Sequence, residues 1–167
     1  AKAFACGNRL ASVLELEPDQ KNGEISGDDL RGEVEFRNVT AHYAGAAQPS
    51  LENISFTAKP GQTIGVIGGT GSGKTTLVNL IPRLYDPSQG TVLIDGRSAE
   101  DYDFISLRHS IGVVPQKAVL FKGTIRQNLK WGNENASEED LWQALETAQA
   151  REVVKDKEGE LDAPVEQ

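Results

Sequence analysis

The sequence predicts an α/β fold, in which short strands and helices alternate around a glycine-rich loop. The apolar residues 63–67 have the composition of a short buried strand. A glycine-rich octapeptide follows directly at residues 68–75, and the residues after it, 76–80, are typical of the start of a helix. A strand, a glycine loop and a helix in this order indicate an α/β core, and further strand and helix patterns lie on both sides.

Three strand patterns surround this loop in the sequence. Residues 33–37 alternate between charged and apolar side chains, as in a half-buried strand, until Asn38 and Val39 break the alternation. Residues 54–58 form a second strand pattern that ends at a Pro-Gly turn. A third strand is predicted at residues 91–94, which lead into an Asp-Gly pair.

The patterns further along the chain mainly predict helices. Short helices are expected at residues 104–110 and 124–130, with a strand at residues 111–114 between them. Residues 137–140 resemble a capping box with acidic residues in the first turn. The helix that they open carries an apolar stripe typical of core packing, made of Leu141, Leu145 and Ala148.

Residues 1–31 precede these patterns and form a lead-in segment. The stretch at residues 9–16 is compatible with the end of a helix that Pro18 stops, and residues 19–29 are polar and loop-like. Two interpretations of the lead-in stay open, a disordered tail and a docked helix. We predict a boundary after residue 31, so that residues 32–167 belong to a separate domain.

The composition is that of one domain or a large part of one. The chain has 167 residues, of which 38% are hydrophobic, and this content can support a core. Its net charge of -8 argues against general nucleic-acid binding, because that function favours a basic face. A single cysteine, Cys6, excludes an internal disulfide, and no run approaches the roughly 18 apolar residues of a membrane span. Because the chain contains no methionine, we expect an excised segment.

The octapeptide fits the pattern G-x-x-x-x-G-K-S/T of a phosphate-binding P-loop. Glycines lack a Cβ atom, so the backbone can point successive N–H groups inward, and the helix N-terminus adds a partial positive charge. Lys74 can reach the β- and γ-phosphates of a nucleotide, and the Thr75 hydroxyl can ligate Mg²⁺. The alternative is a glycine-rich turn that binds nothing. We predict that the chain binds a nucleoside triphosphate through Gly68, Gly69, Thr70, Gly71, Ser72, Gly73, Lys74, Thr75 and Thr76.

Residues 32 to about 154 resemble the nucleotide-binding domain of an ATP-binding cassette (ABC) transporter, and in particular its exporter branch. The motifs that carry this resemblance lie at residues 61–68, 84–90, 92–96 and, with gaps, 107–116 and 120–129. The resemblance implies a P-loop NTPase core with an antiparallel β-subdomain and the start of a helical subdomain. The early strands would form the β-subdomain, and the helical subdomain would begin near residue 117.

The resemblance also implies roles for residues outside the loop. Tyr43 lies where an aromatic ring stacks on adenine, and the alternative is that it packs on the β-subdomain as an edge residue. Gln116 lies at the Q-loop glutamine, which resembles a ligand of Mg²⁺ and water at the junction of two subdomains. Lys74 and Gln116 are therefore expected to act in catalysis, and Thr75 and Gln116 to hold the metal. The expected cofactors are ATP and Mg²⁺.

The chain departs from this family in the motifs that it lacks. It has no Ser-Gly-Gly-Gln signature, no apolar run that ends in Asp-Glu and no switch histidine downstream. Residues 92–95 superficially resemble the Mg²⁺-binding strand, but Gly96 follows them instead of a glutamate. His42 and His109 lie too early to be the switch histidine and are expected to be surface or structural residues. We therefore expect an incomplete cassette, truncated before the signature, that is inactive alone and leaves apolar surface uncovered.

The predicted function is that of the ATP-binding part of an ABC exporter, in which ATP binding and hydrolysis drive substrate export across a membrane. Expected partners are a second nucleotide-binding domain and a transmembrane domain, at the cytoplasmic face of the cell membrane, and no nucleic acid. One alternative is a degenerate cassette that binds ATP without hydrolysing it and serves a regulatory role in a heterodimer. The acidic charge disfavours a soluble cassette protein of translation or DNA repair, and the absence of an Asn-Lys-x-Asp run disfavours a GTPase.

Overall fold

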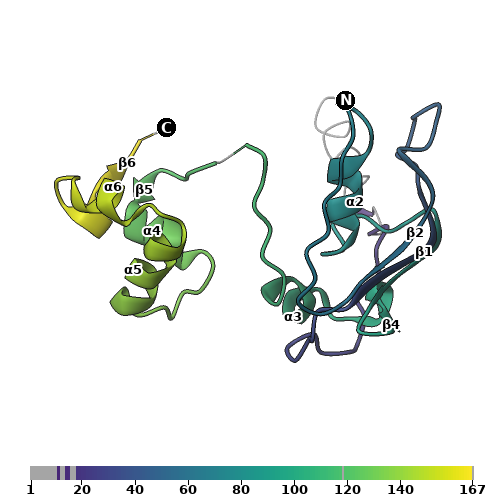
Figure 1. Cartoon of the computed structure of the whole chain (residues 1–167), viewed down its shortest axis with the longest axis horizontal. Helices are drawn as coiled ribbons and strands as arrows, with labels where there is room; N and C mark the ends of the chain where they lie inside the picture. The colour runs from purple at the N-terminus through teal and green to yellow at the C-terminus, as the bar shows by residue number, and fades with distance from the viewer. Residues whose placement is uncertain (1–10, 12–13, 16–17, 118, 167) are drawn as a thin grey trace. The chain divides into compact units, whose positions relative to one another are not determined.

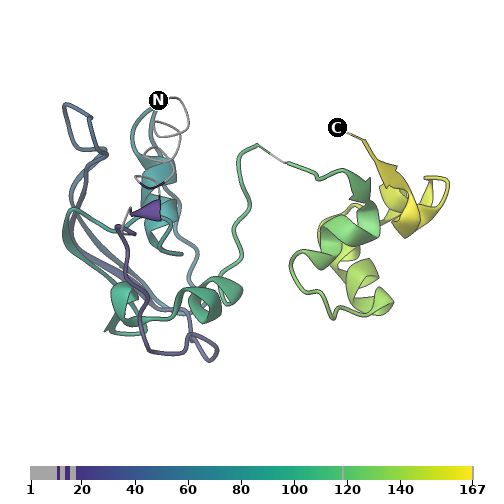
Figure 2. The ribbon, with the colours of Figure 1, turned by 180° about the vertical axis from the view of Figure 1, so that it is seen from behind.

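A computed structural model describes residue 11 and residues 14–15, 18–117 and 119–166 of the chain (Figure 1, Figure 2). Its contacts divide the chain into two compact units, Ala1–Val113 and Val114–Gln167, which we call the N-terminal and the C-terminal unit. The helix predicted at residues 9–16 lies largely outside the described residues. The predicted domain boundary after residue 31 stays a prediction.

The N-terminal unit contains a four-stranded antiparallel sheet with the strand order β2-β1-β3-β4 (Figure 1). The three strands predicted upstream and downstream of the glycine loop are confirmed, and each is longer than or as long as its pattern indicated. The strands are β1 (Val34–Ala41), β2 (Leu51–Ala58), β3 (Gln89–Ile94) and β4 (Arg97–Ser98).

An irregularity in β1 explains why its alternation breaks. The register with β2 shifts between Phe36 and Val39, and Asn38 between them has a left-handed backbone with a φ of 50°. A bulge of this kind inserts an extra residue on one strand and changes which side chains face the core. Phe36 and Val39 are therefore both buried, although they lie three positions apart.

Two short helices complete the core of this unit. They are α2 (Lys74–Leu80) and α3 (Phe104–His109), and a single 3₁₀ turn, η1 (Ala99–Asp101), precedes α3. Leu77 and Leu80 of α2 and Leu107 of α3 are buried in one cluster with Phe36 of β1 and Val92 of β3. The helices predicted after the glycine loop and at residues 104–110 are thus confirmed.

Two predicted strands are not formed. Residues 63–67 and 111–114 have no strand assignment, and Ile67 and Val114 are 99% and 96% exposed. A strand is stable only when a neighbour satisfies its backbone N–H and C=O groups and covers its side chains. No strand among the described residues pairs with either segment, so most of their apolar side chains are exposed, as the sequence led us to expect, although Ile111 packs against the core.

Residues 18–31 of the lead-in form a loop that docks on the rest of the N-terminal unit. Ile25 forms an isolated parallel bridge with Tyr102, and the N–H groups of Glu24 and Ile25 donate to the carbonyl oxygen of Asp101 at 2.9 Å each. Ile25 and Leu30 also pack against the core. The loop predicted at residues 19–29 is therefore confirmed, whereas the choice between a disordered tail and a docked helix stays untested, because residues 9–16 lie largely outside the described residues.

The C-terminal unit is a small group of helices with its own core. Its elements are α4 (Ile125–Lys130), α5 (Glu138–Thr147), α6 (Arg151–Lys155), the 3₁₀ turn η2 (Glu160–Asp162) and the two-residue strands β5 (Gly123–Thr124) and β6 (Pro164–Val165). Side chains from α5, α6 and η2 meet in this core, including Leu141, Leu145, Val154 and Leu161. The predicted helix at residues 124–130 is confirmed.

The cap of α5 follows the predicted pattern, and α4 begins with a capping box that was not predicted. The Ser137 hydroxyl accepts from the Asp140 N–H while the Asp140 carboxylate accepts from the Ser137 N–H, so the predicted capping box is formed. The prediction for Ala148 was wrong, because it is exposed. It caps the end of α5, where the chain turns back, and Ala150 packs against the core instead.

Candidate nucleotide-binding site

The glycine loop at residues 68–75 turns the chain into α2. Gly73 is the N-cap of α2 and has a φ of 84°, a left-handed conformation that glycine adopts without strain. A Cβ atom at this position would also overlap the carbonyl oxygen of Ser50, so the loop backbone lies close to the start of β2. The motif thus has the helix start that a phosphate-binding loop requires, although the strand predicted before it is not formed.

Lys74 places its ammonium group over this loop. Its Nζ donates hydrogen bonds to the carbonyl oxygens of Gly68 at 2.8 Å and Gly69 at 2.6 Å, and to Ser72 Oγ at 3.4 Å. A full positive charge and the first N–H groups of α2 are therefore concentrated at the loop, where a phosphate would accept from both. The neighbouring Thr75 is exposed and its hydroxyl is accessible to a cation.

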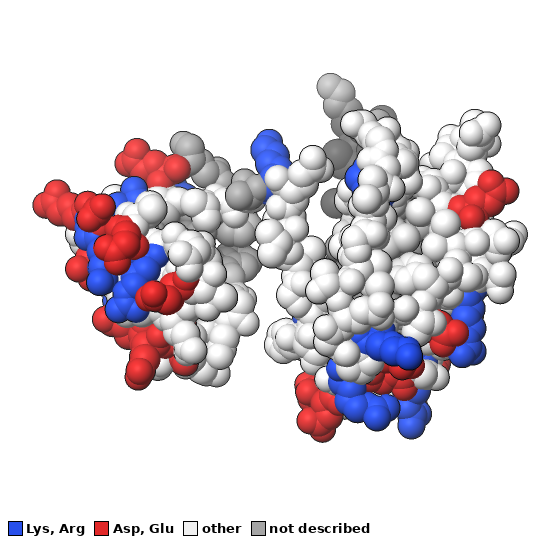
Figure 3. Space-filling view, viewed as in Figure 1, with Lys and Arg blue, Asp and Glu red and all other residues white. Residues whose placement is uncertain are grey.

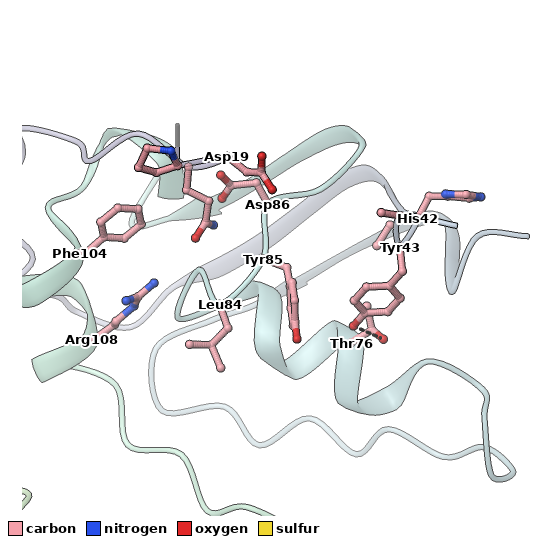
Figure 4. Close-up of a pocket in the computed structure, with 13 residues that line it drawn as sticks. Asp19, His42, Tyr43, Thr76, Leu84, Tyr85, Asp86, Phe104 and Arg108 are labelled. Atoms are coloured by element: carbon pink, nitrogen blue, oxygen red, sulfur yellow. Dashed lines mark hydrogen bonds between the residues drawn. The ribbon is translucent and has the colours of Figure 1, made fainter. Parts of the chain in front are cut away.

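Tyr43 lies beside the helix that the loop opens. Its hydroxyl donates to Thr76 Oγ1 at 3.1 Å, and Thr76 is only 7% exposed. Tyr43 and Thr76 line one cavity of about 690 Å³, drawn in Figure 4. The predicted aromatic residue is therefore next to the predicted phosphate loop, although 33 positions separate it from Thr76 in the chain.

The same cavity contains residues to which the sequence assigned no role. In Figure 4, Tyr85 stands between Tyr43 and a second group of residues, among them Asp19, Phe104 and Arg108. The ring centroids of Tyr43 and Tyr85 are 5.2 Å apart at an interplanar angle of 90°. Tyr85 belongs to a motif that carried the family resemblance, but only the fold shows that its ring meets Tyr43.

The buried Arg83 side chain connects several segments near this second group of residues. It is 2% exposed, and its guanidinium donates to both carboxylate oxygens of Asp86, at 3.1 and 3.2 Å. It also donates to the carbonyl oxygens of Lys21 at 3.2 Å and Glu100 at 3.1 Å, so it joins the lead-in to the segment after β4. The charge of this buried arginine is satisfied by its acceptors, and no pattern in the sequence indicated its burial.

Asp103 caps the start of α3 and is also bonded to the docked lead-in. The Asp103 carboxylate accepts from the Asn22 side chain at 2.7 Å and from the N–H groups of Ile105 and Ser106 at 3.1 and 2.9 Å. The bond from Asn22 is the main reason why the pKa of Asp103 is lowered from its usual value, and the helix N–H groups add to this effect.

Charges are unevenly distributed on the N-terminal unit. On the face shown in Figure 3, few charged side chains lie over α2 and the segment before it, whereas acidic and basic side chains gather near α3 and β4. The overall negative charge therefore does not concentrate at the glycine loop on this face. Few acidic side chains there would offset the positive charge of Lys74 or repel a phosphate.

The predicted metal ligands are not brought together by a described contact. Gln116 is exposed and falls in the C-terminal unit, whereas Thr75 belongs to the N-terminal unit. The described residues contain no group of three or more His, Cys, Asp and Glu side chains that could hold a metal ion. The roles of Thr75 and Gln116 therefore stay predictions, as do those of the loop residues and Tyr43.

No helix within the described ranges has the length and apolar character that crossing a membrane requires. The expected association with a membrane therefore depends on relatives and not on a spanning segment found in this structure.

Comparison with known proteins agrees with the geometry of the loop. The ABC transporter family profile matches residues 51–162. The chain is 44% identical over 153 residues to an uncharacterized ABC transporter ATP-binding protein, YfiB, of Bacillus subtilis, covering 92% of this chain and 27% of that protein. It is also similar to the beta-(1-->2)glucan export ATP-binding/permease protein NdvA of Rhizobium etli, at 42% identity over 92% of this chain and 26% of NdvA.

A third relative is the ATP-dependent lipid A-core flippase of Haemophilus influenzae, at 36% identity over 92% of this chain and 26% of the flippase. The chain thus spans about a quarter of the length of the curated relatives that it matches. The family match covers most of the chain, including the glycine loop and α2. The P-loop NTPase fold class is therefore shown, and the chain belongs to the ATP-binding domains of ABC transporters.

Proposed function

We propose that this chain is the ATP-binding part of an ABC exporter, in which ATP binding and hydrolysis drive substrate export. The observation that carries this proposal is the pairing of the Lys74-bearing loop with Tyr43 through Thr76. A charged phosphate cradle and an aromatic ring at one helix start match the two ends of a nucleotide. Bound ATP supplies the phosphoryl group whose transfer to water releases the free energy for transport.

Each candidate site residue would have one role in binding MgATP. The loop N–H groups and Lys74 bind the phosphates and offset their negative charge. Tyr43 offers a flat apolar face to the adenine, since its hydroxyl is already held by Thr76. Thr75 and Gln116 would each offer an oxygen atom to Mg²⁺, which is the kind of ligand that this cation prefers.

The transport role is inferred from the relatives. NdvA and the lipid A-core flippase are named for the export of a glucan and for the movement of a lipid. By analogy, we expect a transmembrane domain and a second nucleotide-binding domain as partners, at the cytoplasmic face of a membrane. Because the chain lacks the signature and the Asp-Glu strand, we expect little ATP hydrolysis from it alone.

Replacement of Lys74 tests the binding part of this proposal. Lys74→Ala removes a charged hydrogen-bond donor, so the affinity for MgATP should fall by about 10- to 100-fold in a calorimetric titration. Lys59→Ala, at an exposed lysine of the same unit, is the matched control and should bind like the wild type. Equal affinities for wild type and Lys74→Ala, or no MgATP binding by either, would contradict the proposal.

A further inference from the structure

Two contacts hold the Tyr43 ring. Its hydroxyl, at the polar tip, donates to Thr76 Oγ1 at 3.1 Å. The ring itself meets Tyr85 at a centroid distance of 5.2 Å and an angle of 90°, which is a favourable edge-to-face arrangement of two aromatic rings. A ring held at both ends loses little conformational freedom when a base stacks on it, so these contacts raise the affinity for the base.

The turn after α2 places Tyr85 next to Tyr43. Arg83 has a left-handed backbone with a φ of 51°, and the Leu84 N–H donates back to the Asn79 carbonyl oxygen at 3.0 Å. The buried Arg83 side chain is bonded twice to Asp86, so the residues on both sides of Leu84 and Tyr85 are fixed. The backbone that carries Tyr85 is therefore held on both sides by the Arg83–Asp86 pair.

Core packing does not explain the Tyr85 ring. The residue is 46% exposed and is absent from the hydrophobic core of the N-terminal unit. It lines the cavity that also contains Tyr43 and Thr76, as Figure 4 shows. We propose that Tyr85 is a positioning residue for nucleotide binding, which holds Tyr43 in the orientation that stacks on the base. This inference rests on the proposed binding of ATP.

Two ligands distinguish an effect of Tyr85 on base binding from a general effect on the fold or on phosphate binding. MgATP contains the base, whereas magnesium tripolyphosphate presents only the phosphates to the loop. We expect Tyr85→Leu to weaken MgATP binding by about 2- to 10-fold, the range for one aromatic pair, and to leave the affinity for tripolyphosphate unchanged. Tyr85→Phe keeps the ring and should bind both ligands like the wild type.

A double-mutant cycle with Tyr43 makes the test specific, because a positioning residue acts only through the residue that it holds. In a Tyr43→Leu background, Tyr85→Leu should cause no further loss of MgATP affinity. Phe121→Leu is the matched control: Phe121 is 47% exposed and stacks on Trp131 in the C-terminal unit, and its loss should not change either affinity.

The inference would be overturned by no effect of Tyr85→Leu, by an equal loss for both ligands, or by a loss that persists without Tyr43. Wild-type protein that binds tripolyphosphate and MgATP with the same affinity would also overturn it, because the base would then contribute nothing. Wild-type protein that binds neither ligand would instead refute the proposed ATP binding, and the inference would fall with it.

Discussion

The two units of the chain differ in how far apart in sequence their stabilising partners lie. In the N-terminal unit, β1 pairs with β3, so that Val34 lies opposite Ile94, and Arg83 bonds to Lys21 across 62 positions. In the C-terminal unit, α4 and α5 each begin with a capping box whose two residues lie three positions apart. The N-terminal unit therefore depends mainly on partners that are distant in sequence, whereas the helices α4 and α5 of the C-terminal unit begin with contacts between residues close in sequence.

This difference explains which sequence predictions succeeded. Helices satisfy their own backbone, so the helices predicted at residues 104–110 and 124–130 are both formed. Strands need a neighbour, so residues 63–67 and 111–114 remain unpaired although their composition is that of a buried strand. An apolar pattern thus indicates which residues can form a strand, and only the presence of a partner makes it one.

The aromatic residues allow the two units to be followed separately. All three tyrosines, Tyr43, Tyr85 and Tyr102, lie in the N-terminal unit, and both tryptophans, Trp131 and Trp142, lie in the C-terminal unit. Tryptophan fluorescence therefore reports on the C-terminal unit alone. Hydrogen exchange of peptides from each unit provides an independent measurement for both.

The largest effect is expected from Arg83→Met, which keeps most of the side-chain volume but removes the buried charge. Asp86 and several carbonyl oxygens would lose their donor, at a cost of about 4 kcal/mol to the N-terminal unit. Urea titration followed by hydrogen exchange should show this loss in peptides of the N-terminal unit. The tryptophan signal should keep its midpoint.

Arg37→Met is the control for this change, because Arg37 is exposed and, among the described residues, forms its ion pair with Glu35 of the same unit. It should leave both transitions in place. If Arg83→Met and Arg37→Met have the same effect, Arg83 is not the buried connection that we describe. A shift of the tryptophan transition by Arg83→Met would show that the units are not independent.

A smaller effect of about 3 kcal/mol is expected from Leu161→Ala, because the change leaves a cavity in the core of the C-terminal unit. Leu161 is 2% exposed and packs with Leu141, Leu145 and Val154. The midpoint of the tryptophan transition should fall in urea. Val153→Ala is the control, because Val153 is 63% exposed, and it should leave this midpoint unchanged. Equal shifts for the two variants would contradict the role of Leu161 in the core of the C-terminal unit.

The smallest effect concerns the pH dependence of the lead-in. The pKa of Asp103 is lowered from 3.8 because Asn22 and the start of α3 donate to its carboxylate. The carboxylate therefore stabilises the folded N-terminal unit above about pH 4, and this contribution is lost as the pH falls through the lower folded-state pKa. Asp103→Asn should be less stable than the wild type at pH 6, and the difference should disappear near pH 2.

Thermal unfolding monitored by the tyrosine signal between pH 6 and pH 2 would measure this difference. Glu52→Gln on the exposed face of β2 is the control and should show no such pattern. Asp140→Asn should give the same pH pattern in the tryptophan signal, since the pKa of Asp140 is lowered by Ser137. A constant gap between Asp103→Asn and wild type at all pH values would contradict the role of the ionised carboxylate.

The sequence by itself determined the glycine loop, the helix after it, three of the strands, the helices near residues 104–110 and 124–130 and the capping box at residues 137–140. Each of these follows from residues that are close in the chain or from a pattern that one segment carries alone. It also indicated Lys74, through the P-loop pattern, and Tyr43, through the family resemblance, before the contacts of either residue were known.

Only the tertiary structure decided which side chains meet. The contacts of Tyr43 with Thr76 and Tyr85, the burial of Arg83 and the docking of residues 18–31 join segments that are tens of residues apart. No local pattern encodes such contacts, because they depend on where the bulge in β1 and the turn after α2 direct the chain. For the same reason, residues 63–67 and 111–114 needed partner strands that their own composition could not supply.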